Sequence, residues 1–466
     1  MTSITAGLYI GRDALMAQQT AINVTGQNIS NVNTPGYSRQ RVNFENTSVQ
    51  TSEGSVGTGV RVTSVNRVVD QFINADINTA LQQKGAWEAM QQATDQTNNI
   101  FTETATQGIS QQMSKFWNAW QDVSNNPSGY SERSALLTQS QTLTSNIQNV
   151  YKSLTQVQTD MDGHVTDAVN QINTLASQIG KLNDQIALSE TSSGTSANDL
   201  RDQRDALLNQ LSQKINLTSS EDPATGRVTV TLGDGHVLVG TSPYGKLSTM
   251  VNASSGYHDV VWDTAPTTSI NGSITAGNLN GWITARDTTV AGYKTQLNTL
   301  AAQLIQSVNT LHTAGTGLDG STGNNFFSGA SASDIQVNPT ISGNVNKIAA
   351  AAPGAAPNVL NGDNTQAVAI VNLQNSLTMS GNTTTFGAYY SSLVSSAGTD
   401  SKNAASNFTQ QTTAVTQMQN LQASVSGVST DEEMVNLIQY QHAYSAAAKL
   451  VDTVTQMMDT VLNMVR

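Results

Sequence analysis

The chain begins with the stretch ITAGLYIGRDALMAQQTAINVTGQNISNVNTPGYSRQ (residues 4–40), on which the predicted fold depends. Large apolar residues recur every seven positions, and small residues lie beside them: Leu8, Leu15, Ile22 and Ile29, with Gly7, Ala14 and Ala21. This pattern predicts an amphipathic helix with a narrow apolar seam and room for a close partner helix. Because Pro35-Gly36 cannot continue a helix, we expect it to end near Asn33.

The end of the chain gives the strongest helical signal. Residues 429–433 (STDEE) hold two overlapping capping boxes, and their acids suit the start of a helix. Residues 430–466 therefore predict a helix of about 55 Å. Its two apolar stripes are Met434, Leu437, Tyr444, Ala448, Val451, Met458, Leu462 and Val465, and Ala447, Leu450, Val454, Met457, Val461 and Met464. One stripe suffices to pair with the first helix, so the second predicts contacts with other subunits.

The predicted interface therefore combines both ends of the chain. Its residues are Leu8, Leu15, Ile22, Ile29, Met434, Leu437, Tyr444, Val451, Val454, Met458 and Leu462.

Composition limits the possible functions. The 466 residues leave room for about three domains. The net charge of −12, without runs of like charge, argues against nucleic acid or an anionic membrane as a partner. The absence of cysteine excludes disulfides and thiol nucleophiles. We find no cleaved signal peptide and no membrane span in the sequence, so an exported chain would need a leaderless route.

The middle of the chain is mainly helical in pattern. Residues 47–59 are rich in Gly and Ser, and 60–69 (VRVTSVNRVV) suggest an extended segment. Thin apolar stripes on polar helices recur from there on and favour an elongated bundle over a globule. Helical patterns cover residues 70–106, a run around 113–120, 131–186, 198–213, 280–311, 364–377 and 389–425, and residues 315–362 are expected to be loop with short turns.

A small β domain interrupts the helices. RVTVTL (227–232) alternates strictly, Gly233-Asp234-Gly235 turns, and HVLVG follows, which predicts a hairpin. The predicted fold is mainly α, with paired terminal helices (1–60 plus 429–466) and an elongated bundle (61–215 plus 278–428). The β domain (216–277) is inserted at the tip of the bundle.

No motif gives positive support for an enzyme, a cofactor or a metal. GTGLDG (315–320) matches a dinucleotide-binding pattern on paper, but it follows a helix rather than a strand. Asp199, Asp202 and Asp205 suit a solvated, salt-bridged helix face better than a metal or acid/base cluster. The scattered histidines favour surface or packing roles: His164, His236, His258, His312 and His442.

Residues 28–41, NISNVNTPGYSRQR, resemble the N-terminal signature of flagellar rod, hook and hook-associated proteins. The matching positions are Asn28, Asn31, Thr34, Gly36, Tyr37, Arg39 and Gln40. The Tyr37-Ser38-Arg39-Gln40 ending is more similar to the hook-associated protein 1 family than to hook or rod proteins. Three further segments agree: NDLRDQRDALLNQLS (198–212), NTLHTAGTGLDGSTGNNFF (309–327) and the last helix. The chain is short for that family, which suggests that an outer domain is reduced or missing.

The resemblance implies a non-enzymatic structural protein of the extracellular flagellum. Such a protein passes unfolded through the type III export channel and forms a ring of subunits between hook and filament. Its neighbours would be the hook protein and the next junction protein, and an export chaperone would bind the C-terminal helix. By the same resemblance, His312 and the following glycines would fix a loop at a helix end, without a catalytic role.

Two alternatives remain at this stage. One is a rod or hook axial protein, which would polymerise as a longer array. The other is a secreted surface adhesin or enzyme whose activity lies in the β insertion. Outside a polymer, we expect the terminal helices to be poorly ordered, because few contacts offset about 1–2 kcal/mol of backbone entropy per residue.

Overall fold

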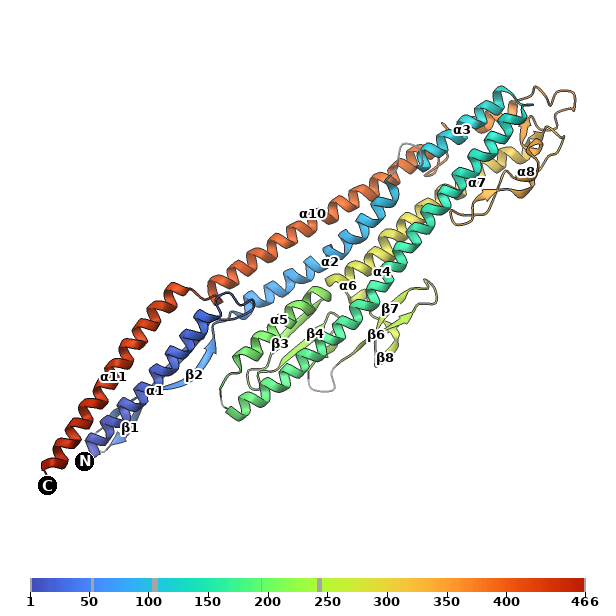
Figure 1. Cartoon of the computed structure of the whole chain (residues 1–466). Coiled ribbons are helices and arrows are strands. Elements are labelled where there is room, and N and C mark those ends of the chain that lie inside the picture. Colours follow the sequence, from blue (N-terminus) through green and yellow to red (C-terminus); the bar gives the residue numbers. More distant parts are fainter. Residues whose placement is uncertain (1, 52–53, 103–107, 194, 241–244, 465–466) are drawn as a thin grey trace.

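The two ends of the chain lie side by side at one end of an elongated molecule (Figure 1). The computed structural model describes residues 2–51, 54–102, 108–193, 195–240 and 245–464. Long helices dominate it and the sheets are small, which confirms the predicted fold class.

The helices follow the predicted pattern closely. They are α1 (Thr2–Ser30), α2 (Gln71–Phe101), α3 (Ile109–Asn125), α4 (Tyr130–Ser193), α5 (Asn198–Lys214), α6 (Gly277–Thr284), a π-helical turn (Ala285–Val290), α7 (Ala291–Ala314), α8 (Pro339–Gly343), α9 (Thr365–Asn372), α10 (Phe386–Ser426) and α11 (Thr430–Met464), with short 3-10 turns at Asn271–Ser273 and Val345–Lys347.

The strands are short except for the first two. They are β1 (Gln40–Thr51), β2 (Gly54–Arg67), β3 (Leu217–Glu221), β4 (Val228–Leu232), β5 (Val237–Val239), β6 (Leu247–Val251), β7 (His258–Trp262), β8 (Ala265–Ser269), β9 (Thr316–Gly317), β10 (Phe327–Ser328), β11 (Gln336–Val337) and β12 (Ala349–Ala351).

The terminal unit consists of α1, α11 and the antiparallel β1–β2 hairpin, which lies along α1 (Figure 1). The hairpin faces α1 with pairs such as Val42 opposite Val65. Its core is small: Ala21, Val24 and Val42, with Val62, Val65 and Tyr440 packed against them.

The hairpin differs from the sequence-based expectation. Strand β2 was expected as an extended segment, whereas β1 was not predicted. Its polar residues, such as Asn43 and Asn46, are poor strand formers and face solvent. The proposed boundary between residues 60 and 61 falls inside β2, so the whole hairpin belongs with the terminal helices.

The outer unit contains α2 to α10 and has a large apolar core. Phe116 and Trp120 of α3 pack with Phe326 and Phe327 from the long loop after α7. The guanidinium of Arg133, almost fully buried, donates to the carbonyls of Pro127 (2.8 Å) and Ile348 (2.7 Å) and so holds this loop at the outer end. Burial lowers the pKa of Arg133 to about 10.

The β insertion forms two three-stranded antiparallel sheets, β3–β4–β5 and β6–β7–β8. Both sheets are bound to the C-terminal half of α4: Asn183 donates to the carbonyl of Val228, and Asn173 donates to the carbonyl of Leu247. The sheets thus lie along the side of α4 rather than at the tip expected from the sequence (Figure 1). The buried side chains of β4 and β6 join the main core, and this contact fixes the position.

Candidate functional site

The two terminal helices pair through small residues. A Cβ atom added to Gly11 would lie 2.6 Å from Cγ2 of Val451, and one added to Gly7 would lie 3.1 Å from Cγ2 of Val454. The buried apolar residues of α1 are Ala17, Ala21 and Val24. The predicted seam residues lie beside this line, and all are half-buried: Leu8, Leu15, Ile22 and Ile29.

The two apolar stripes of α11 were predicted to have separate partners, one facing α1 and the other facing other subunits, but the residues that contact α1 do not follow this division. Ala447 and Val454, of the second stripe, are buried against α1. From the first stripe, Leu437, Val451 and Met458 are half-buried, while Met434, Tyr444 and Leu462 are exposed. Val465 lies outside the described residues. The side of α11 that faces α1 therefore draws residues from both stripes.

A broad apolar surface remains uncovered on the terminal unit. Its exposed large side chains are Tyr9 and Met16 on α1, and Met434, Val435, Ile438, Tyr444, Leu450, Met457, Val461, Leu462 and Met464 on α11. Monomeric soluble proteins rarely expose apolar patches of this kind unless a partner covers them.

The signature segment closes a buried polar cluster, which we call the signature cluster: Asn28, Tyr37, Arg39, Gln40 and Glu433. The amide nitrogen of Asn28 donates to the carbonyl of Gln40 (2.9 Å) and to Oε2 of Glu433 (3.0 Å). Its amide oxygen accepts from the Tyr37 hydroxyl (2.8 Å) and the Gln40 backbone N–H (3.0 Å). All four hydrogen-bonding positions of this amide are thus occupied.

Glu433 connects this cluster to the start of α11. Nε of Arg39 donates to Oε1 of Glu433 (2.8 Å), and the Arg39 backbone N–H donates to the carbonyl of Ser426 (2.9 Å). Burial, then Asp199, Asp202 and Glu433, raise the pKa of Tyr37 to about 12, so its hydroxyl stays protonated as a donor. Glu433 was predicted only as part of a helix cap, so sequence reasoning missed its role.

The remaining signature residues form the turn between α1 and β1. Thr34 donates to the side-chain oxygen of Asn31 (3.1 Å), and Asn31 donates to the carbonyl of Gln27 (3.0 Å). Gly36 has φ of +80°, a conformation that residues with a Cβ rarely adopt. These contacts end α1 at Ser30, close to the expected end.

The acidic face of α5 is not the solvated surface that the sequence suggested. Asp202 accepts from the Ser38 hydroxyl (2.7 Å) and from Arg67 (2.6 Å), and Asp205 accepts from Arg67 (2.8 Å). Burial raises the pKa of Asp205, although Arg67 opposes this. Salt bridges are present as predicted, but Asp202 and Asp205 pair with Arg67 of the hairpin, and Asp202 also accepts hydrogen bonds from Ser38 of the linker before it.

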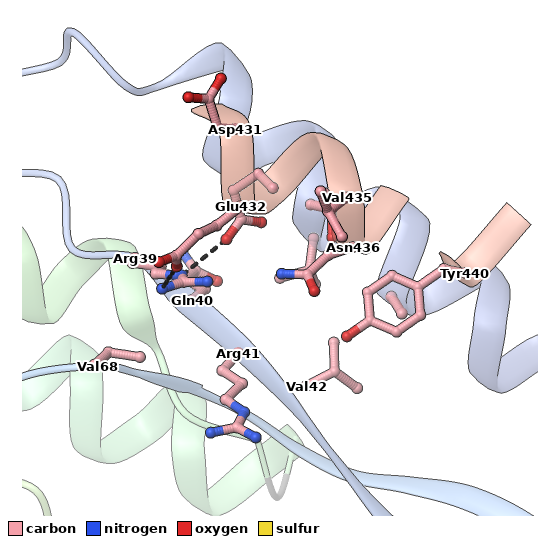
Figure 2. A pocket seen from close by; sticks show the side chains of 14 residues that line it. Arg39, Gln40, Arg41, Val42, Val68, Asp431, Glu432, Val435, Asn436 and Tyr440 are labelled. Carbon is pink, nitrogen blue, oxygen red and sulfur yellow. Dashed lines mark hydrogen bonds and ion pairs between the residues drawn. The ribbon is translucent and has the colours of Figure 1, made fainter. Parts of the chain in front are cut away.

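A groove of about 600 Å³ lies between α1, β1 and the first turns of α11 (Figure 2). Val42 and Tyr440 line its apolar part, while Arg39, Arg41 and Glu432 line its polar part. The groove thus exposes the edge of the small terminal core.

The histidines pack or pair as expected. His164 stacks on Trp282, His258 pairs with Asp162, and His236 lies beside Asp234. His442 is exposed on α11. Nδ1 of His312 contacts the Asn324 carbonyl (2.7 Å) and Nε2 accepts from the Ala349 N–H (2.9 Å), which confirms its role in fixing a loop.

The glycine-rich motif at residues 315–320 does not have the surroundings of a dinucleotide site. Residues 315–320 follow helix α7 directly and form part of a loop, so the strand–turn–helix context of a dinucleotide site is not present there. Among the described residues, no group of three His, Cys, Asp or Glu side chains could hold a metal ion. No described helix is long and apolar enough to cross a membrane.

Comparisons with known proteins agree with this architecture. The family model "Flagellar hook-associated protein FlgK helical domain" matches residues 94–327. The models "Flagella basal body rod protein" and "Flagellar basal body rod FlgEFG protein C-terminal" match residues 8–37 and 409–464.

Full-length relatives extend the match. The flagellar hook-associated protein 1 of Bacillus subtilis is 30% identical, with 99% of both chains covered. That of Escherichia coli is 27% identical over 96% of this chain and 98% of its own. The solved structure of the flagellar hook junction protein FlgK from Burkholderia pseudomallei has a similar fold, with a TM-score of 0.67 at 18% identity, covering 75% of this chain and all of that one. The chain therefore belongs to the flagellar hook-associated protein 1 family.

Proposed function

We propose that this chain is a structural component of the bacterial flagellum that forms the junction between hook and filament. Subunits would assemble into a ring through their terminal helices, between the hook protein and the next junction protein on the filament side. The chain would act outside the cell, after type III export, and without enzymatic activity. The uncovered apolar surface of α1 and α11 is the observation that carries this proposal.

The two sides of α11 differ in what covers them. The side toward α1 is closed by Ala447 and Val454, whereas Met434 and Ile438, four positions apart on the opposite side, remain 52% and 51% exposed. Burying a fully exposed side chain of this kind contributes about 1.5–3 kcal/mol, so covering a half-exposed one contributes roughly half of that. Several of them, repeated around a ring, supply the driving force for assembly without a covalent step.

Aspartate on the exposed side of α11 tests this proposal. Ile438→Asp or Met434→Asp should leave the free chain folded and abolish filament growth in cells that lack the wild-type gene. Leu8 and Leu437 are less suitable because both are half-buried, so a charge there would also disturb the α1–α11 pair. Gln439→Asp, at an exposed polar position, is the matched control and should support swimming. Normal filaments with both apolar variants would contradict the proposal.

An export chaperone at α11 is a further part of the proposal. The same exposed apolar side chains would aggregate before assembly unless a partner covered them. A pull-down with a chain that ends before residue 429 should lose the chaperone. If such a chain kept the chaperone, its binding site would lie elsewhere.

A rod or hook protein is the second candidate, because rod-family models match both terminal segments. Only the model matching residues 94–327 is specific to hook-associated proteins. Electron microscopy of flagella with a labelled chain decides between them. The junction proposal predicts label only where hook meets filament, and label along the hook or rod would overturn it.

The β insertion offers a test of the adhesin or enzyme alternative. Deleting residues 216–277 would remove buried members of the main core, such as Val230 and Leu247, and would disturb the whole outer unit. A charge on the exposed strand β8, for example Thr267→Lys, leaves this core intact. The junction proposal predicts normal motility for this variant. An adhesin or enzyme acting through β8 predicts loss of surface binding or activity instead.

A further inference from the structure

The terminal and outer units meet through polar contacts. The apolar clusters of the described residues stay within one unit: one joins α1, the hairpin and Tyr440, and the others lie among α2 to α10. Two short linkers connect the units, residues 68–70 between β2 and α2 and residues 427–429 between α10 and α11. Neither an apolar core nor a long interface therefore fixes the angle between the units.

One face of α5 makes most of the side-chain contacts across this junction. We call Asn198, Asp199, Asp202 and Asp205 the α5 ridge. Asp202 lies four positions after Asn198 and three positions from both Asp199 and Asp205, so the four residues share one side of the helix. Asn198 donates to the carbonyl of Val65 (2.8 Å) and to the side chain of Gln40 (3.1 Å).

Asp202 is the centre of the ridge. Its two oxygens accept from the backbone N–H (3.0 Å) and the hydroxyl (2.7 Å) of Ser38, on the linker that follows α1. The same carboxylate accepts from Arg67 at the end of β2 (2.6 Å), and both side chains are only 10% exposed. One carboxylate thus holds both ends of the hairpin at once.

The arginines of α5 connect this helix to the outer unit. Arg201 pairs with Glu190 of α4 (2.7 Å) and with Glu221 of β3, and the fully buried Arg204 donates to the carbonyl of Gly226 and also pairs with Glu221. The alternating acids and arginines of residues 199–205 therefore face two different partners. The acids face the terminal unit, and the arginines face the outer unit.

We infer that the contacts of α5 with both units fix the angle between the terminal unit and the outer unit, with Asp202 as the main positioning residue. Hydrogen bonds to charged groups depend strongly on direction, so a few of them can define an orientation without a shared apolar core. This inference goes beyond the proposed function, because the orientation belongs to the free chain and does not depend on what the chain assembles with.

Distance measurements between spin labels test whether α5 fixes the angle between the two units. The chain has no cysteine, so labels can be placed at Gln456→Cys on α11 and Lys181→Cys on α4, both exposed. The close contacts between α1 and α11 and the signature cluster should order the terminal unit more than the sequence alone indicated, so we expect one narrow distance distribution for the otherwise unchanged chain. Asp202→Ala should shift or broaden it, and Arg67→Gln should do the same from the other side of the contact. Glu45→Ala, which removes the exposed partner of Arg61 within the hairpin, should leave it unchanged.

A second label pair separates orientation from general loosening. Lys181→Cys with Ser395→Cys lies wholly within the outer unit, at exposed positions, and should give the same distribution with and without Asp202→Ala. If Asp202→Ala reduces the helix content, Ser38→Ala, which removes only the hydroxyl donor, takes its place. An unchanged distance across the junction in these variants would overturn the inference. Equal broadening within the outer unit would overturn it as well.

Discussion

The outer and terminal units differ in how they bury apolar surface. In the outer unit, Phe116, Trp120, Phe326 and Phe327 are completely buried and in contact with one another. In the terminal unit, the buried apolar residues are small and the large ones of α11 are exposed or half-buried. The outer unit thus has what a domain needs to fold alone, whereas the terminal unit leaves many of its large apolar groups uncovered.

This difference indicates what each unit contributes to stability. Apolar burial should dominate the free energy of unfolding of the outer unit. In the terminal unit of the free chain, close helix contacts and the signature cluster must hold the helices together. Substitutions in the two units should therefore have unequal effects in the free chain.

Phe116→Ala should have the largest effect. Truncating a fully buried phenylalanine costs about 3–5 kcal/mol of unfolding free energy, because apolar contact is lost and a cavity remains. Met434→Ala, at a side chain 52% exposed on α11, should change it by less than about 0.5 kcal/mol. Denaturant unfolding followed by circular dichroism measures both. Similar losses for the two variants would contradict the comparison.

His312 should make the outer unit sensitive to acid. Burial lowers its pKa from 6.5 to about 4, although the Asn324 carbonyl opposes this. Between pH 6.5 and 4, the unfolded chain binds the proton that the folded chain excludes, so stability is lost as the pH falls through this window. The loss should reach roughly 3 kcal/mol. Unfolding at several pH values measures it, and His312→Gln should flatten the slope. An NMR titration that places the pKa of the His312 imidazole near 6.5 in the folded chain would contradict this prediction.

Glu433→Ala should loosen the terminal unit more than the outer one. The variant removes a buried acceptor from both Asn28 and Arg39, at an expected cost of about 2 kcal/mol. Glu432→Ala, whose side chain is 63% exposed, is the control and should cost no more than about 1 kcal/mol. Hydrogen exchange of residues 430–440 in the free chain reports the difference. Equal exchange rates in the two variants would show that Glu433 does not hold α11.

The smallest expected effect is the difference in stability between two glycine substitutions in α1. Both Gly11→Ala and Gly26→Ala gain helix propensity, but only the new methyl at position 11 would meet Val451, at 2.6 Å, while position 26 has no atom within 4 Å. We expect Gly11→Ala to be less stable than Gly26→Ala by about 1 kcal/mol, because close-packed contacts tolerate little extra volume. Exchange rates of amides in α1 measure it, and equal rates would mean that the two helices are not in close contact.

Most of the helical architecture could be predicted from the sequence, because apolar periodicity and the Pro35-Gly36 break are local signals. Strand β1 could not be, since its polar residues carry little strand propensity and its pairing depends on β2. The position of the β sheets along α4 depends on contacts such as Asn183 with Val228, which no local pattern encodes.

The candidate site was predictable in part. The signature residues around Asn28 were found from their resemblance to a family, and the pairing of the two termini from the stripes. Glu433 and Asp202 were missed as contact residues, because a run of acids at a helix start and a charged helix face both have common solvated explanations. Their partners are hundreds of positions away for Glu433 and over a hundred for Asp202, as the bonds to Asn28 and Arg67 show.

Other subunits should cover the exposed side of α11 in the assembled flagellum. Maleimide labelling of a single cysteine at Ile438→Cys, in a chain otherwise free of cysteine, tests this directly. We expect rapid labelling of Ile438→Cys in the free chain and strong protection in assembled flagella, while Lys181→Cys on the outer unit stays reactive in both. Equal labelling of Ile438→Cys before and after assembly would show that no other subunit covers this side of α11.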